Sequence, residues 1–185
     1  LRVLPKMNVL APCDSYELTC LLNQTFLQNN ATYIRIGKKG EPLIHGVDEK
    51  IQFGKVRKIK DGHSICFLSA GTIISEVLNA VHILEQKNIS CAIYSNHTVK
   101  PLDAAFLKKA IKSYKLLVIV EEHGKLGGLA SSILEWACFN SIETNKIISI
   151  GTCDKFLHTI GDQNFARQLY EIDSKSILEK LEQFL

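Results

Sequence analysis

Short apolar runs alternate with helix-length segments along almost the whole sequence, and this alternation constrains the fold more than any other feature. Six runs have the length and β-forming composition of strands, at residues 9–11, 32–36, 64–68, 90–94, 116–120 and 147–150. Strands that are joined by helix-length crossovers pair in parallel. The sequence therefore predicts an α/β fold with a mainly parallel sheet between two helical layers, a three-layer αβα arrangement.

The most apolar run, residues 116–120, is expected to be an interior strand that is covered on both faces. Glu121, Glu122 and His123 follow it directly, where an open α/β sheet usually places its ligands or partner surfaces. Successive side chains of a strand point to opposite faces, so Glu121 and Glu122 are not expected to act as a paired acid/base dyad. We treat these three residues as a candidate interface or strand-end site.

Three glycines, at positions 124, 127 and 128, come between this acidic pair and a predicted helix. Two interpretations of the turn remain open. Its backbone amides could hold an anion at the start of the helix. Alternatively, the glycines only allow a tight turn and close packing of helix on strand.

The N-terminal part of the chain looks like a separate unit. Asp14 and Glu17 have the spacing of a capping box, and Leu18, Leu21, Leu22 and Thr25 then recur at the spacing of one helix face. Glycine and proline interrupt residues 37–54, as is typical of a linker. We divide the chain into residues 1–40, a linker at 41–54, and a larger unit at 55–185.

Charge and hydropathy exclude several classes of partner. The formal net charge is only +3, which argues against nucleic acid or an anionic membrane as the main partner. A basic run of Lys55, Arg57, Lys58 and Lys60 is read as a solvated strand edge. No apolar run reaches the roughly 20 residues that span a bilayer, and no signal peptide is visible, so a cytoplasmic protein is expected.

The cysteines and the known cofactor motifs give no complete active site. Six scattered cysteines without a C-x-x-C pair are expected to be reduced, and no metal site is expected. The sequence has no G-x-G-x-x-G after a strand and no Walker A motif, and we assign no catalytic residue. Residues 161–164 (GDQN) faintly resemble a magnesium-diphosphate motif but lack its second glycine, so a polar loop is expected there.

Arg35 and Lys38 are candidates for binding a substrate phosphate, because they end a predicted strand just before the glycine-rich stretch. Arginine would bind phosphate as a fork and lysine as a point charge. A salt bridge or contact with solvent is an equally open role for each.

Several motifs, taken in order, resemble the C-terminal section of transketolase-like thiamine diphosphate enzymes. They cover most of the chain, at residues 32–38 (TYIRIGK), 53–55 (FGK), 69–73 (SAGTI), 99–103 (VKPLD), 120–124 (VEEHG) and 127–129 (GGL). Each motif is weak alone, but their order and spacing are specific. The resemblance implies that residues 1–40 are the C-terminal tail of a pyrimidine-binding α/β domain and that residues 55–185 are a transketolase C-terminal domain.

The resemblance also implies a function for the complete enzyme. It would move a two-carbon ketol unit between sugar phosphates, with thiamine diphosphate and Mg²⁺ supplying the carbanion chemistry. In the family, the cofactor-activating glutamate and the magnesium motif lie upstream of anything present here. This chain is therefore expected to bind no cofactor alone and to be inactive alone. An arginine of the family that holds the sugar phosphate corresponds to Lys38, which loses the bidentate grip; Arg35 would compensate from the other side of the strand.

The expected partners are the remaining transketolase domains or a separate subunit, within a homodimer of the full enzyme. Two alternatives stay open. The first is a deoxyxylulose-phosphate synthase or the beta subunit of a 2-oxo acid dehydrogenase, which share the architecture. The second is a non-catalytic docking module that holds a partner at Glu121–His123. The chain begins with Leu1 and has one methionine, so we expect it to be a fragment of a longer polypeptide.

Overall fold

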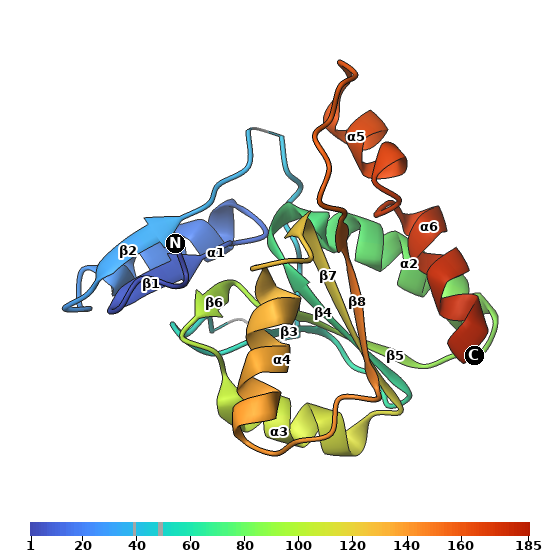
Figure 1. Cartoon of the computed structure of the whole chain (residues 1–185), viewed down its shortest axis with the longest axis horizontal. Coiled ribbons are helices and arrows are strands. Elements are labelled where there is room, and N and C mark those ends of the chain that lie inside the picture. Colours follow the sequence, from blue (N-terminus) through green and yellow to red (C-terminus); the bar gives the residue numbers. More distant parts are fainter. Residues whose placement is uncertain (39, 48–49) are drawn as a thin grey trace.

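The fold of this chain is built on two sheets of different size. The computed structural model describes residues 1–38, 40–47 and 50–185. Within them, a five-stranded sheet has the order β3-β5-β4-β7-β8, and a three-stranded sheet has the order β2-β1-β6. Figure 1 shows the small sheet and helix α1 standing to one side of the large sheet. Residue 39 of the predicted N-terminal unit and residues 48–49 of the predicted linker lie outside the described residues.

The helices and strands alternate along most of the chain, as the sequence predicts, except that β2, β3 and β4, then β5 and β6, and then α5 and α6 follow one another directly. The strands are β1 (Met7–Leu10), β2 (Ala31–Ile34), β3 (Arg57–Lys60), β4 (Ile65–Ala70), β5 (Cys91–Ser95), β6 (Thr98–Lys100), β7 (Leu116–Gly124) and β8 (Ile147–Thr152). The helices are α1 (Ser15–Thr25), α2 (Ile74–Gln86), α3 (Ala104–Ser113), α4 (Leu129–Phe139), α5 (Gln163–Leu169) and α6 (Ser174–Leu181), with 3₁₀ turns η1 (Gly71–Ile73) and η2 (Glu182–Phe184).

The large sheet lies between two helical layers, which confirms the three-layer αβα prediction. Strands β4, β5, β7 and β8 pair in parallel, and only β3 is antiparallel to its neighbour β5. Phe67 and Val118 face a core that α2 and α6 cover, whereas Leu68 and Ile119 face a second core under α3 and α4. Strand β7 is therefore buried on both faces, as its apolar run predicts (Figure 1).

The small sheet has a much smaller core. Strand β1 pairs in parallel with β2 on one side and antiparallel with β6 on the other. Its buried apolar cluster consists of Leu10, Leu21 and Ile51. Leu22, which the helical spacing places on the inward face of α1, is exposed, so that prediction was wrong. The cluster under α1 covers only the part of the helix around Leu21.

A buried ion cluster joins the two parts of the fold. Asp14 caps α1 by accepting from the Glu17 N–H at 2.7 Å, as the capping-box spacing predicts. Glu17 reaches back to the N–H of Cys13 at 2.8 Å rather than to that of Asp14. Arg57, from β3, lies 3.3 Å from Glu17 and 3.7 Å from Asp14 and donates to the Ile44 carbonyl at 2.7 Å. The three charged groups thus hold α1, residue 44 and the edge of the large sheet together.

Two local predictions need correction. The basic run does form an edge strand, β3, but Arg57 is buried rather than solvated because it pairs with two carboxylates. Residues 161–164 are not all loop, since α5 begins at Gln163. Asp162 caps this helix by accepting from the Phe165 N–H at 2.8 Å.

Candidate functional site

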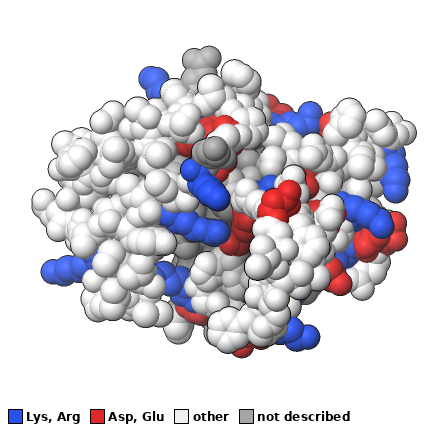
Figure 2. Space-filling view, turned by 90° about the horizontal axis from the view of Figure 1, so that it is seen from above, with Lys and Arg blue, Asp and Glu red and all other residues white. Residues whose placement is uncertain are grey.

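The carboxyl ends of the parallel strands carry the candidate site. Strand β7 runs past its apolar core and continues through Glu121, Glu122 and His123 to Gly124. Figure 2 views the molecule from above, where basic and acidic side chains lie next to one another near the middle of the visible face. Glu121 is buried and its side chain meets α4, whereas Glu122 points toward η1 and α5. The expected alternation of the acidic pair is therefore confirmed.

Glu121 fills the N-terminus of α4 from within the protein. Its two carboxylate oxygens accept from the N–H groups of Leu129 at 2.7 Å and Ala130 at 2.9 Å. A Cβ atom at Gly128 would lie 2.1 Å from a Glu121 oxygen, so this approach requires glycine. Two of the amides that the sequence offered to an external anion are thus occupied by Glu121. Burial raises the pKa of Glu121 despite these hydrogen bonds.

Glu122 is held by three side chains that come from η1 and α5. Its carboxylate accepts from Thr72 Oγ1 at 3.3 Å, from Gln163 Nε2 at 2.9 and 3.0 Å, and from Arg167 Nη2 at 3.1 Å. Arg167 is 6% exposed and also pairs with Glu76 at 3.3 Å. Gln163 and Arg167 belong to α5, so this short helix is fastened to the end of β7.

Arg35 links the end of β2 to this cluster. Its Nη1 donates to the backbone carbonyl of Glu122 at 2.6 Å. One strand-end acid, Glu122, and the basic pair at residues 35 and 38 are thus brought to one place. They come from strands in different sheets, and only the tertiary fold makes them neighbours.

A cavity of about 150 Å³ lies between the two parts of the fold at this point. Its polar lining consists of Arg35, Lys38, Thr72, Glu122 and Gln163. A Cβ atom on Gly37 would lie 3.1 Å from Thr72 and would overlap the side chain of Glu41, so the backbone before Lys38 packs closely against its neighbours. The cavity presents two cations and two neutral hydrogen-bonding groups beside one carboxylate.

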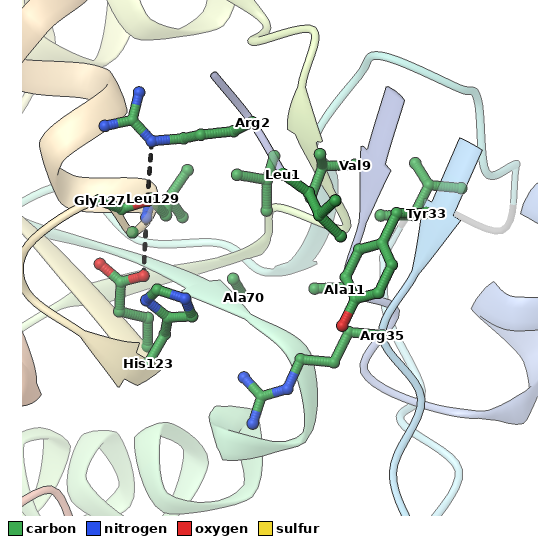
Figure 3. A pocket seen from close by; sticks show the side chains of 14 residues that line it. Leu1, Arg2, Val9, Ala11, Tyr33, Arg35, Ala70, His123, Gly127 and Leu129 are labelled. Carbon is green, nitrogen blue, oxygen red and sulfur yellow. Dashed lines mark hydrogen bonds between the residues drawn. The ribbon is translucent and has the colours of Figure 1, made fainter. Parts of the chain in front are cut away.

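His123 and Arg35 border a second cavity, of about 190 Å³. Figure 3 shows Arg35 and Tyr33 entering it from the small sheet, with His123 opposite and Arg2 above. Arg2 is bound to the carbonyl of Gly127 at 2.8 Å and to the carboxylate of Glu135. His123 Nδ1 lies 2.9 Å from the Gly124 carbonyl, so the predicted strand-end residue faces this second cavity and does not join the Glu122 cluster.

Sequence reasoning missed Thr72, Gln163 and Arg167 as members of the cluster. Arg167 lies 45 positions after Glu122, and no local spacing connects the two. Among the described residues, no three His, Cys, Asp or Glu side chains converge to hold a metal ion. The same part of the chain has no helix with the length and apolar character needed to cross a membrane.

Comparisons with known proteins match this chain to transketolase-like proteins. Residues 54–144 match the family model described as "Transketolase, C-terminal domain". A relative from Methanocaldococcus jannaschii, named a putative transketolase C-terminal section, is 28% identical over 98% of this chain and 56% of its own length. A 1-deoxy-D-xylulose-5-phosphate synthase from Dictyoglomus turgidum is 32% identical over 98% of this chain and 29% of its own length.

A solved structure extends the similarity to the fold of almost the whole chain. The structure is titled "Split gene transketolase, inactive beta4 tetramer" and superposes with a TM-score of 0.85 at 23% identity, covering 98% of this chain and 58% of that one. The chain thus spans little more than half of that structure and of the Methanocaldococcus jannaschii relative. The chain contains a transketolase-like C-terminal domain, which the family model matches over residues 54–144.

Proposed function

We propose that this chain is the C-terminal section of a transketolase-like transferase that moves a two-carbon ketol unit between sugar phosphates. The observation that carries the proposal is the match to a transketolase C-terminal section over 98% of this chain. The family-model match to residues 54–144 supports it independently. Because the chain spans 56% of that relative, we propose that the complete enzyme includes an upstream part.

In this proposal, residues 1–40 are the tail of a pyrimidine-binding domain, residues 41–54 are a linker, and residues 55–185 are the transketolase C-terminal domain. The incomplete packing of the N-terminal unit supports this division. Phe26 and Leu27 are 78% and 81% exposed, and β2 is the edge strand of a sheet whose core has three buried apolar residues among those described. An upstream part of the same domain would cover these side chains and pair with β2.

Thiamine diphosphate and Mg²⁺ belong to the complete enzyme in this proposal. In the part of the chain that the structure describes, no three His, Cys, Asp or Glu side chains converge to hold a metal ion. The expected partner is the upstream half, fused or separate, in a cytoplasmic homodimer of the full enzyme.

Lys38 and Arg35 are proposed to bind the phosphate of the sugar substrate. Both line the cavity of about 150 Å³, beside the donors Thr72 and Gln163. The small polar cavity and its two cations suit a phosphate monoester. Arg35 would donate two parallel hydrogen bonds to it, and Lys38 would contribute a single positive charge. The role of the C-terminal domain is then to hold these residues in place and to supply domain and dimer contacts.

A second candidate function is favoured by the synthase relative, which is 32% identical over 98% of this chain. That protein is named a 1-deoxy-D-xylulose-5-phosphate synthase, and this chain covers 29% of it. The two candidates differ in the donor substrate. The synthase reading predicts that the assembled enzyme consumes pyruvate and does not transfer a ketol unit between sugars.

The test is reconstitution. The chain is coexpressed with the upstream transketolase-like half from its source, and the purified complex is supplied with thiamine diphosphate and Mg²⁺. We expect ketol transfer between sugar phosphates from the complex and none from either half alone. Lys38→Ala should raise KM for phosphorylated substrates and leave KM for unphosphorylated analogues within about twofold. A well-folded, cofactor-loaded complex without ketol transfer would refute the transferase proposal, and pyruvate consumption would identify the synthase.

A further inference from the structure

The cavity that lies beside Lys38 has a feature that opposes phosphate binding. Glu122 lines it together with Arg35 and Lys38, so a carboxylate stands in the wall where a phosphate would enter. Two like charges at contact distance in a partly desolvated cavity repel each other strongly. A site for a sugar phosphate therefore needs the charge of Glu122 to be compensated.

Arg167 provides this compensation. Its guanidinium lies 3.1 Å from the Glu122 carboxylate and is almost fully buried, so water screens the pair only weakly. Gln163 donates to both Glu122 oxygens at 2.9 and 3.0 Å. The carboxylate is thus fixed in direction and paired with a cation that does not itself line the cavity.

The same cluster fixes Arg35. With Glu122 held by α5, its backbone carbonyl accepts from Arg35 Nη1 at 2.6 Å. A guanidinium has five N–H donors, and this contact occupies one of them. The remaining donors keep a defined direction beside Lys38, which is what a bidentate grip on phosphate requires.

We infer that Arg167, together with Gln163, is a positioning residue for substrate phosphate: it cancels the charge of Glu122 and holds the strand end that orients Arg35. The inference rests on the proposed function, because it assigns the residues that make the proposed phosphate cavity accept an anion. It makes α5 part of the substrate site, although α5 lies 125 positions after Lys38 in the sequence.

Arg167 has a second ion pair that allows a matched control. Glu76 lies 3.3 Å from Arg167 and also accepts from the Ser174 N–H at 3.0 Å, so it joins α2 to α5 and to the start of α6. Glu76 is not among the residues that line the cavity. A purely structural role for Arg167 would depend on Glu76 at least as much as on Glu122.

The experiment compares four variants of the reconstituted enzyme. Three are the single substitutions Arg167→Leu, Glu76→Gln and Lys38→Ala, and the fourth is a double variant that combines Arg167→Leu with Glu122→Gln. KM and kcat are measured for a phosphorylated substrate and its unphosphorylated analogue, with Tm for each variant. We expect Arg167→Leu to raise KM for the phosphorylated substrate by about tenfold, with KM for the analogue within about twofold. Adding Glu122→Gln should restore KM to within about threefold of wild type, because it removes the uncompensated charge. Glu76→Gln should lower Tm without separating the two KM values.

Equal changes in both KM values for Arg167→Leu, or no rescue by Glu122→Gln, would overturn the inference. If Lys38→Ala separates the two substrates but Arg167→Leu does not, only this inference fails. If Lys38→Ala does not separate them, the proposed phosphate contact fails first.

Binding of inorganic phosphate to this chain gives a readout that does not depend on activity. Phosphate is titrated into the wild-type chain and the Arg167→Leu chain, and the backbone amide signals of Gly37 and Lys38 are followed by NMR. We expect Kd to be about tenfold weaker in Arg167→Leu and to recover with Glu122→Gln. Equal Kd values, or no response at these two residues, would contradict the inference.

Discussion

Two arginines bridge pairs of carboxylates in this molecule, and the difference between them separates structure from function. Arg57 lies between Asp14 and Glu17, and Arg167 lies between Glu76 and Glu122. Both arginines are almost fully buried. The carboxylates around Arg57 are buried too and hold the N-terminal helix, whereas Glu122 also lines a cavity with two other cations. The same residue types thus form an internal ion cluster in one place and, in our proposal, one wall of a phosphate-binding cavity in the other.

The two clusters should respond differently when the buried charge loses its partner. Breaking a buried ion pair leaves an uncompensated charge in a poorly solvated place, which typically costs about 3–5 kcal/mol. Asp14 and Glu17 are 5% and 0% exposed, so they should show this full penalty. Glu122 borders a cavity and keeps Gln163 and Thr72 as hydrogen-bond donors, so its penalty should be smaller and should appear in ligand affinity.

The largest expected effect is therefore at Arg57. Arg57→Met should lower the free energy of unfolding by about 3–5 kcal/mol, because Asp14 and Glu17 are left buried without a cation. Urea denaturation, followed by circular dichroism, measures the loss. Lys60→Met is the matched control on the same strand, because its pair with Glu85 is exposed and should be worth less than about 1 kcal/mol. Similar losses of unfolding free energy for both variants would show that the Arg57 cluster stabilises the fold no more than an exposed ion pair does.

The second effect, of about 2 kcal/mol, is expected at the cap of α4. Glu121→Ala leaves the N–H groups of Leu129 and Ala130 without their acceptors inside the protein. Thermal and urea unfolding measure the change. Glu135→Ala serves as the control, since it removes a glutamate from an exposed pair with Arg2 and should cost less than about 1 kcal/mol. If Glu121→Ala proved neutral, Glu121 would not be the structural cap of this helix.

A smaller effect is expected from pH at His97, which is fully buried close to the Arg57 cluster. Burial lowers the pKa of His97 below its usual 6.5, a shift that Glu17 opposes and Arg57 favours. Below pH 6.5 the unfolded chain therefore binds a proton that the folded chain does not. His97 should cost stability as the pH falls from 6.5 toward its folded-state pKa. Denaturation at pH 7.5 and 5.5 should show a larger loss for wild type than for His97→Gln; equal losses would contradict this sign.

The smallest effect on stability is expected at Lys38, where the expected change is in affinity. Lys38→Arg should restore a bidentate grip and lower KM for phosphorylated sugars about threefold in the reconstituted enzyme. The free energy of unfolding should change by less than about 0.5 kcal/mol, because Lys38 is exposed. Steady-state kinetics and urea denaturation check both numbers. A raised KM would indicate that the cavity is shaped for lysine.

Residues 116–124 show how far local sequence could predict this molecule. The apolar run and the acidic pair predicted an interior strand with side chains alternating at its end, and both predictions are confirmed. Asp14 was identified as a helix cap from spacing alone. These features depend on contacts within a few residues, so periodicity and capping rules describe them well.

Arg57 and Arg167 show where local sequence fails. A run of four basic residues predicts a solvent-exposed strand edge. The fold instead places two carboxylates from the N-terminal end of α1 beside Arg57. Arg167 stands in a segment that carried no recognisable pattern, and its partners lie 91 and 45 positions earlier. The prediction that Leu22 is buried failed for a related reason. The spacing of apolar residues identifies one face of a helix but does not say how much of that face the rest of the protein covers.

The most direct test of the account is to isolate this chain natively from its source cells and to measure the intact mass and thiamine diphosphate content of the complex. The account predicts a species in which an upstream transketolase-like half, fused or separate, carries about one cofactor per copy of this chain and transfers ketol units. Recovery of this chain alone, folded and without cofactor, would contradict the proposal and would favour a binding role for the fold.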